Sequence, residues 1–430
     1  MANTDPYRGK WLTILFLLGL LHVILDARYR IVSLFPATPI GYAVLGVIFF
    51  IISLALISPL NSFGRLSSPL DSWIRRKLRP IVKGMQQHRL LTFGVVTIMV
   101  LAGCWFRWLF IKQLPIEPRY ADMLPLIRAA CEKLTNGENP YGFVYPMPWV
   151  LPMTYWPGLW LPYWVPHVLS VDLRWVHLVV IACVSPLFCW FLKGSGKHNS
   201  PLAPAAPIAA FSALFLFLFS SESIIFANIG HTPPLWMWVS LLAFAVIQKR
   251  FWMSAIMLGI LLASRQTAVV YAPLVAIYWF RASASWRTTA LLSLGACGTY
   301  LVLCGPFLAL TPHAFLIDPM RHYTVLGNWD FTKGGTGFCA NTIGLSYMIR
   351  CLREEWLLPL ASALAVIVPC VLAWWRLNSR SDLLLYMGFA GMASALTAPI
   401  PWHYEYFPPL ILFAFASIAA AIEEDDTPST

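Results

Sequence analysis

Long apolar runs, separated by short polar segments, follow one another along almost the whole chain. Several of them are shorter than the roughly 20 residues that a straight membrane-spanning helix needs. Proline and glycine interrupt many of them, which a helix bundle tolerates because neighbouring groups satisfy the exposed backbone. The pattern predicts an all-α, polytopic integral membrane protein. The predicted helices lie at 11–25, 38–60, 92–111, 148–168, 176–193, 204–227, 233–248, 252–264, 267–280, 288–310, 356–376, 382–400 and 406–422.

The composition agrees with a chain that lipid surrounds. Of the 430 residues, 59% are hydrophobic and 11% are charged, against about 45–50% and about 25% in soluble domains. The mean hydropathy is +0.67. Lipid must therefore solvate much of the apolar surface, which excludes a soluble globular fold, a disordered chain and a secreted disulfide scaffold.

The charge distribution orients the predicted helices. The 30 Lys and Arg residues outnumber the 19 Asp and Glu residues, giving a net charge of +11. Because the basic residues concentrate in short connections, we interpret them as topology signals and expect no nucleic-acid partner. Segments 249–250, 281–287 and 376–380 are basic, and so is the connection at 61–91, which we expect to be cytoplasmic. Against one acid, Asp71, that connection carries Arg65, Arg75, Arg76, Lys77, Arg79, Lys83 and Arg89.

This orientation places three loops outside, at about 113–147, 312–355 and 399–405. One segment conflicts with it: if every apolar run crosses, the basic linker 193–198 lies outside, whereas the later charge pattern puts it inside. Either the proline- and tryptophan-rich stretch 146–168 does not cross fully, or the charge rule fails locally. We therefore expect about 12 transmembrane helices.

Polar chemistry gathers at the outer face. Ionisable side chains are nearly absent from the interiors of the apolar runs, with His22 and Glu222 as the main exceptions. This distribution argues against a proton-coupled pump, whose relay acids usually lie at membrane depth. The nine cysteines form no CxxC motif and no Cys/His cluster with metal spacing. Cys339 and Cys351 share one loop and would pair only in an oxidising compartment.

The first outer loop contains a short amphipathic helix. Within 119–134 the apolar positions repeat at helical spacing, so we expect this helix to lie along the membrane surface. These positions are Met123, Ile127, Ala130, Cys131 and Leu134. Asp122 stands at its start and has two interpretations. It is either an N-cap that accepts backbone N–H groups, or a general base at the water–lipid boundary that takes a proton from a hydroxyl.

Aromatic residues are dense after the turn-rich segment 136–141. They suit an interfacial belt, and they equally suit the apolar faces of sugar rings. These aromatic residues are Trp149, Tyr155, Trp156, Trp160, Tyr163 and Trp164.

Four segments, taken in order, resemble a known family. Asp122 followed by Asn139-Pro140-Tyr141 and a proline-rich helix start is similar to the first outer loop of GT-C class membrane glycosyltransferases, most closely glycosyltransferase family 87. Asn228-Ile229-Gly230-His231 stands where that family often has a Gly-Gln turn. Segment 341–346 followed by Arg350 resembles its Asn-Gln-Ser-Leu-x-Gly…Arg stretch. Segment 398–406 resembles its Ser-Pro-Ile-Ser-Trp-x-His-His element, with Glu405 in place of the second His.

The resemblance covers roughly residues 92–420. It implies a GT-C-like catalytic domain at 92–430, preceded at 1–91 by two transmembrane helices and the basic cytoplasmic loop. It also implies a large first extracytoplasmic loop that is catalytic and bears a juxtamembrane helix. The implied reaction is inverting transfer of a sugar, mannose-like in this family, from a polyprenyl phosphate to a lipid or glycan hydroxyl. The implied base is Asp122, and a lone carboxylate suits direct displacement because inversion requires no second carboxylate as nucleophile.

The departing phosphate requires cations, preferably Arg for its two-pronged hydrogen bonding. Arg265 interrupts an apolar stretch where two short helices meet, and it is either a phosphate ligand or a snorkelling turn residue. His403 either binds phosphate or sugar or is simply interfacial. The full set of candidate donor-binding residues is Arg119, Tyr120, Arg265, Arg321, His322, Lys333, Asn341, Arg350, His403 and Glu405.

The remaining expectations concern partners and place. The outer loops have no dense acidic cluster, so we predict that no metal ion is required, although some GT-C enzymes use a divalent cation. The predicted partners are the polyprenyl-phosphate sugar, its acceptor and membrane lipids. The predicted location is a bacterial inner membrane with the site on the extracytoplasmic side. Three alternatives stay open: a glycan polymerase or ligase, a flippase for lipid-linked sugars, and a non-catalytic assembly subunit.

Overall fold

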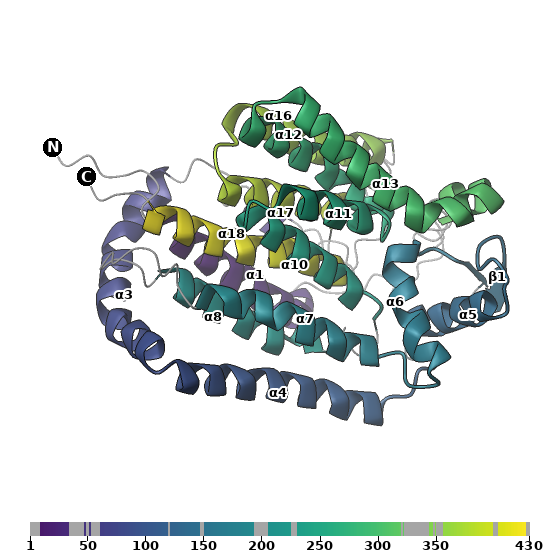
Figure 1. Ribbon diagram of the computed structural model, residues 1–430, viewed down its shortest axis with the longest axis horizontal. Coiled ribbons are helices and arrows are strands. Elements are labelled where there is room, and N and C mark those ends of the chain that lie inside the picture. The colour runs from purple at the N-terminus through teal and green to yellow at the C-terminus, as the bar shows by residue number, and fades with distance from the viewer. Residues whose placement is uncertain are drawn as a thin grey trace.

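The protein is a bundle of apolar helices. A computed structural model of the chain describes residues 9–33, 47–48, 51–52, 61–118, 121–146, 150–192, 205–224, 230–319, 321, 344–346, 349, 356–398 and 403–426. Its principal helices lie side by side along the long axis (Figure 1). They are α1 (Lys10–Ser33), α4 (Arg89–Gln113), α7 (Trp175–Leu192), α8 (Ala205–Phe219), α10 (Pro233–Ile247), α11 (Phe251–Leu262), α12 (Ala272–Ser283), α13 (Trp286–Leu310), α16 (Leu357–Arg376), α17 (Arg380–Thr397) and α18 (Phe407–Asp426).

Six helices of the described chain are long and apolar enough to cross a membrane: α1, α4, α7, α13, α16 and α18, the last counted from Tyr404. Three shorter apolar helices, α8, α10 and α11, accompany them. This confirms an all-α, membrane-embedded protein. Most helices match the predicted apolar runs to within a few residues, but α1 continues to Ser33, beyond the run 11–25, and α8 ends at Phe219, before the end of the run 204–227. The run at 38–60 lies largely outside the described residues, and the structure differs at 148–168. The figure of about 12 crossings stays a prediction, as does the division of the chain at residue 91.

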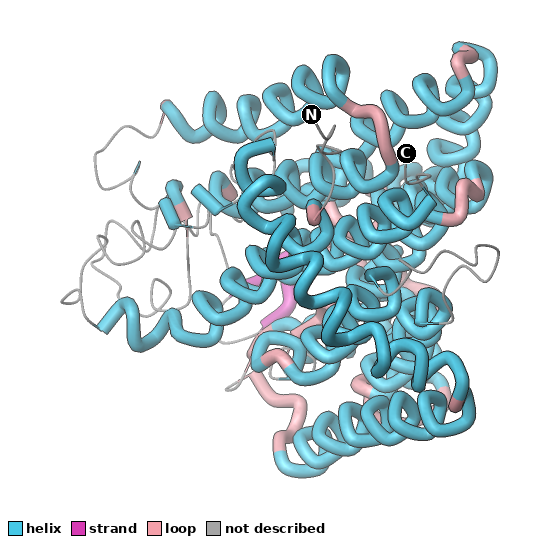
Figure 2. The backbone as a smooth tube through the Cα atoms, turned by 90° about the vertical axis from the view of Figure 1, so that its left-hand side faces the viewer, coloured by secondary structure: helices cyan, strands magenta, loops and turns pink. Residues whose placement is uncertain are grey.

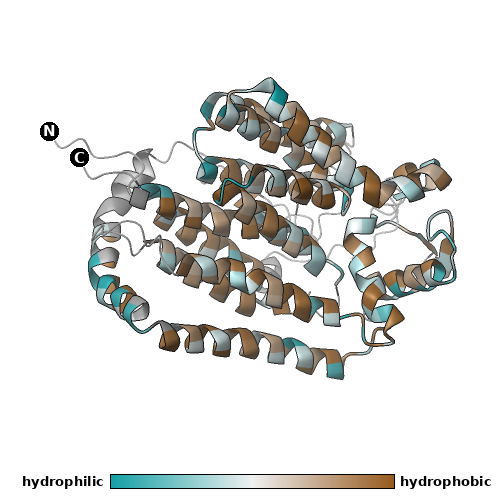
Figure 3. Ribbon diagram, viewed as in Figure 1, coloured by the Kyte–Doolittle hydropathy of each residue, from teal (hydrophilic) through white to brown (hydrophobic). Residues whose placement is uncertain are grey.

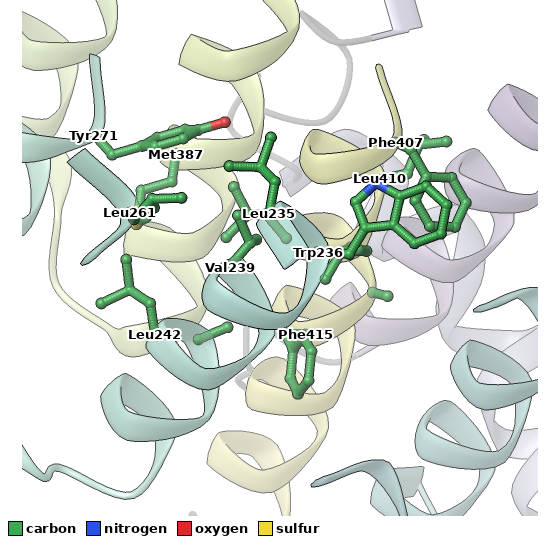
Figure 4. Packing of buried hydrophobic residues seen from close by; sticks show 14 of the residues in the cluster. Leu235, Trp236, Val239, Leu242, Leu261, Tyr271, Met387, Phe407, Leu410 and Phe415 are labelled. Carbon is green, nitrogen blue, oxygen red and sulfur yellow. The ribbon is translucent and has the colours of Figure 1, made fainter. Parts of the chain in front are cut away.

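The core lies where α18 meets its neighbours. This helix packs against α1, α8, α10 and α17, and its residues from Phe407 to Ala421 are almost all buried. Trp236 of α10 lies against Phe407, with ring centroids 4.4 Å apart. Leu235, Val239 and other apolar side chains fill the space around them (Figure 4). A fully apolar helix in this position is buried by protein on all sides rather than by lipid on one.

The two ends of the bundle differ. At one end α3 (Asn61–Gln87) crosses the ends of the other helices, and both described termini lie there (Figure 1). At the other end lie α5 (Met123–Thr135) and a hairpin of β1 (Val144–Pro146) and β2 (Val150–Pro152), coloured magenta in Figure 2. We refer to these as the α3 end and the α5 end. The connection at 61–91, expected as a loop, is thus largely helical.

Ion pairs tie the helices together at the α3 end. Lys10 Nζ lies 2.7 Å from Asp382 Oδ1, and Arg380 Nε lies 3.2 Å from Glu423 Oε1. Arg380 also donates to the carbonyl oxygen of Ile247, and Arg281 to that of Leu377. The basic segments 249–250, 281–287 and 376–380 therefore share one end, as their charge predicts.

The stretch 146–168 does not cross the bundle. Its helix, α6 (Pro157–Val168), has only 12 residues, and the next element, α7, begins where α4 ends. There Arg174 donates to the carbonyl oxygens of Leu114 and Ile111 at 2.7 and 2.9 Å. The first of the two interpretations of this stretch is therefore correct, because α6 stays at the α5 end (Figure 1). Helix α7 then runs to the α3 end, where it ends at Leu192. The linker 193–198 itself lies outside the described residues.

One buried cation was missed by the sequence pattern. Arg107 lies inside α4 with no exposed surface. Its guanidinium donates to the carbonyl oxygens of Gly103 and Leu218 at 2.8 and 3.0 Å, and to the hydroxyl of Ser223. Gly103 belongs to α4 itself, whereas Leu218 lies at the carboxyl end of α8, where backbone carbonyls lack helical partners, and Ser223 follows that end. Arg107 therefore closes the end of α8 and fastens it to α4.

Candidate functional site

Asp122 stands directly before α5 at the α5 end. It occupies the N-cap position of this helix, but its side chain makes no capping hydrogen bond. Its side chain is partly exposed, whereas the following residues Leu124, Leu126 and Ile127 are buried. The apolar face of α5 packs on α6. The capping interpretation therefore loses its main interaction, and the residue is partly open to solvent.

His231 connects the start of α5 to two other segments. Its Nδ1 atom lies 2.8 Å from Sδ of Met123, the neighbour of Asp122. Its ring stacks on Tyr155, with centroids 4.1 Å apart, and meets the ring of Tyr404 edge-on at 5.9 Å. Its Nε2 atom is buried with no hydrogen-bond partner among the described residues. The turn before α10 thus joins the segments at 122, 155 and 404 in one cluster.

Arg265 and Glu405 form a buried ion pair beside this cluster. The guanidinium Nη2 lies 2.6 Å from Oε1 of Glu405, and each side chain is 10% exposed. Tyr404 lies near the guanidinium, which is 6.0 Å from the ring centroid. Of the two interpretations of Arg265, the structure contradicts the snorkelling one, because the side chain is enclosed by protein. The segments around 265 and 405 are 140 residues apart in the chain.

Close backbone packing fixes the position of Arg265. It follows the end of α11 and precedes the 3₁₀ helix η1 (Gln266–Tyr271). The N–H of Gly158 donates to the carbonyl oxygen of Ala263 at 2.8 Å. A Cβ atom at position 158 would lie 2.6 Å from Ser264 Oγ and 2.7 Å from the carbonyl oxygen of Ile260. Only glycine allows α6 to approach α11 so closely.

The Asn-Pro-Tyr turn is held by hydrogen bonds. Tyr141 donates its hydroxyl to the carbonyl oxygen of Tyr155 at 2.7 Å and accepts from Trp160 Nε1 at 3.0 Å. Asn139 Oδ1 accepts from the Tyr141 N–H, and its Nδ2 donates to Thr311. The turn therefore braces Tyr155 beneath His231. Because Trp160 is fully buried, it is not part of an interfacial belt, and the same is true of Tyr163.

Burial controls the protonation of His231. Removal from water, together with the positive charge of Arg265, holds the pKa of His231 well below its ordinary value. The neutral imidazole is therefore the stable form in the folded protein. Its Nδ1 or Nε2 carries one proton, so the ring offers one donor and one acceptor.

Acidification is expected to destabilise the protein through this histidine. In the unfolded chain the imidazole binds a proton near pH 6.5, whereas folded His231 does not. The contribution of neutral His231 to the free energy of unfolding is therefore fully present above about pH 6.5. Below that pH the free energy of unfolding falls by up to about 1.4 kcal/mol per pH unit. Thermal unfolding in detergent at pH 7.5 and pH 5.5 should show a smaller loss for His231→Gln than for the native chain. Substitution of the exposed His313 should leave the loss unchanged, and equal losses in all three proteins would contradict the assignment.

The other predicted site residues are either exposed or lie wholly or partly outside the described residues. Arg321 is exposed. His403 begins the 3₁₀ helix η3 (His403–Tyr406), and its side chain lies outside the described residues. Also outside them are the two cysteines expected to share a loop, 339 and 351, and the candidates Arg119, Tyr120, His322, Lys333, Asn341 and Arg350. Three residues of the cluster, Tyr155, His231 and Tyr404, were not predicted as site residues. Each of them lies in a segment that stood out in the sequence.

Two apolar hollows open on the bundle. One of about 490 Å³ lies between α6, α10, α11 and α13, and Gly158 lines it together with Leu161, Trp238 and Leu303. The other, of about 750 Å³, lies between α4 and α7. Among the described residues, no three His, Cys, Asp or Glu side chains are grouped to hold a metal ion. Metal independence stays a prediction.

Comparison of the chain with protein-family models, curated proteins and solved structures found no match. The resemblance to GT-C glycosyltransferases therefore rests on the residues of this chain alone.

Proposed function

We propose that the chain is an inverting glycosyltransferase of the GT-C type, with about 12 transmembrane helices and the reacting groups at the α5 end. It transfers a sugar, mannose-like by resemblance, from a polyprenyl phosphate to a lipid or glycan hydroxyl. The location proposed is the extracytoplasmic face of a bacterial inner membrane. One observation carries the proposal: His231 contacts both Met123 and Tyr404, beside the Arg265–Glu405 pair.

That contact supports a common site because its members come from four distant parts of the chain. Asp122, His231, Arg265 and Glu405 each belong to a segment with polar residues at the end of an apolar run. Bringing charged groups together at a membrane boundary costs desolvation energy. We infer that a charged ligand is the reason for their placement at the α5 end.

The reaction assigns a task to each group. The Asp122 carboxylate takes the proton of the acceptor hydroxyl, and the oxygen attacks the anomeric carbon of the sugar from the face opposite the phosphate. The bond between that carbon and the phosphate oxygen breaks, and its electron pair leaves on the polyprenyl phosphate. A guanidinium stabilises the negative charge that develops there, and this task falls to Arg265. Glu405 holds the guanidinium in place until the phosphate arrives.

The lipid tail of the donor also needs a place. The hollow between α6, α10, α11 and α13 is lined by apolar side chains. It shares Gly158 with the junction that positions Arg265. An isoprenoid chain in this hollow would thus have its phosphate close to the guanidinium.

A panel of donors tests the proposal. Purified protein is incubated with radiolabelled polyprenyl-phosphate mannose, arabinose and glucose, and the release of polyprenyl phosphate is measured. Release with one of them, accompanied by labelling of a hydroxyl acceptor, is the expected result. Vesicles that translocate the labelled lipid without cleaving it would instead favour a flippase. Joining of two lipid-linked glycans would favour a polymerase or ligase.

A further inference from the structure

Helix α3 has the position of a helix that lies flat on a membrane surface. The bundle helices run along the long axis of the molecule, and α3 crosses their ends at a steep angle (Figure 1). Figure 2 views the molecule from this end, and α3 passes in front of the other helices. If the apolar bundle crosses the bilayer, α3 therefore lies close to the plane of its surface.

The exposed side chains of α3 divide into two opposite strips. Leu70, Trp73 and Ile81 are 51%, 56% and 56% exposed, and at about 100° per residue they fall within roughly 80° of one another. Arg76, Arg79 and Lys83 are exposed on the other side of the helix. Val82, 5% exposed, faces the protein between the two strips.

Contact with water alone does not explain why large apolar side chains lie exposed on α3. Large apolar side chains, one of them a tryptophan, are exposed on the same helix as a strip of cations. In Figure 3 the coloured part of α3 carries teal segments, whereas α4 is largely brown. Helices of this kind bury their apolar strip at the boundary of head groups and acyl chains, and Trp is enriched at that depth. Lys77 lies within the apolar strip, where its long side chain can reach the head groups.

The exposed cations of α3 indicate the class of lipid that this helix binds. Arg76, Lys77, Arg79 and Lys83 are exposed, and none forms an ion pair with another described residue. The acid of this helix is Asp71 alone. A zwitterionic head group offers no net charge to such a cluster, whereas an anionic phospholipid does. We propose that α3 is a binding surface for anionic phospholipids in the leaflet at the α3 end.

The proposal is tested on the full-length protein in detergent. Short-chain phosphatidylglycerol and phosphatidylcholine of equal length are titrated onto it, and the dissociation constants are measured by thermophoresis. Each basic side chain near an anionic surface contributes about a fivefold gain in affinity. We therefore expect tight binding of phosphatidylglycerol alone. The variant Arg76→Gln/Lys77→Gln/Arg79→Gln/Lys83→Gln should lose at least tenfold in affinity.

A matched variant separates α3 from net charge. Lys249→Gln/Arg250→Gln/Arg287→Gln/Arg376→Gln removes four exposed cations from the same end but none from α3, and it should bind normally. A charge-conserving exchange of Lys and Arg at the four α3 positions should retain binding, which shows that the affinity follows the charge and not the identity of the side chains. Equal affinity for both lipids, or equal loss in both neutralised variants, would overturn the proposal. So would tighter binding of polyglutamate than of phosphatidylglycerol, which would indicate an acidic protein partner.

Discussion

Asp122→Asn should lower the rate of sugar transfer by about 10²–10⁴-fold, the usual contribution of a general base. The amide has nearly the same shape as the carboxylate but cannot accept the acceptor's proton at neutral pH. Because the substitution nearly conserves the shape of a partly exposed side chain, the folded structure should survive the change. The measurement is turnover of the polyprenyl-phosphate sugar, together with its dissociation constant, which should change less than twofold.

Glu132→Gln is the matched control for this experiment. Glu132 is an exposed carboxylate on the same helix, α5. Its substitution should leave both turnover and donor affinity unchanged. Undiminished transfer in the Asp122→Asn protein would show that another group is the base.

Removing one partner of the Arg265–Glu405 pair should reduce stability strongly. Each side chain is 10% exposed, so Arg265→Met leaves a buried carboxylate without its counter-ion. Such a loss costs about 3–5 kcal/mol. The double variant Arg265→Met/Glu405→Leu replaces both charges with apolar groups and should recover most of the stability. Thermal unfolding in detergent measures both effects.

Donor binding distinguishes the structural from the chemical task of this pair. The double variant should remain unable to bind polyprenyl-phosphate sugar although its stability returns, because no guanidinium is left for the phosphate. The pair Lys10–Asp382 at the opposite end provides the control. Its apolar replacement should leave donor affinity unchanged. If the stable double variant binds donor as the native chain does, Arg265 is not the phosphate ligand.

The helices could be predicted from the sequence because lipid imposes a simple rule on apolar runs. Where that rule weakens, prediction failed in an understandable way. The run at 148–168 looked like a span, but it contains strand β2 and the short helix α6 instead. The connection at 61–91 looked like a loop because its charges were counted without their helical period, which places Arg76, Arg79 and Lys83 on one side of α3.

Several residues of the candidate site could be predicted from the sequence, but the contacts between them could not. Asp122, Arg265 and Glu405 stood out as polar residues beside apolar runs. The pairing of Arg265 with Glu405 joins positions 140 residues apart, and no local spacing encodes such a distance. The contacts of His231 with the rings of Tyr155 and Tyr404 depend likewise on how distant segments pack together. Arg107 was missed because two of its acceptors are backbone carbonyls, which leave no mark in a sequence, and its side-chain acceptor, Ser223, lies 116 residues away in the chain.

Arg107 also has a consequence for how the protein is made. During synthesis α4 enters the membrane before α8 exists, and an arginine near the middle of an inserting helix costs about 2.5–3.5 kcal/mol. Arg107 stands closer to the carboxyl end of α4, so its side chain can reach the head groups at first. It must leave them when α8 arrives to accept its hydrogen bonds. Arg107 therefore makes the insertion of α4 less favourable, and it stabilises the folded protein through its hydrogen bonds to the end of α8. The docking of α8 is thus a required step in biogenesis.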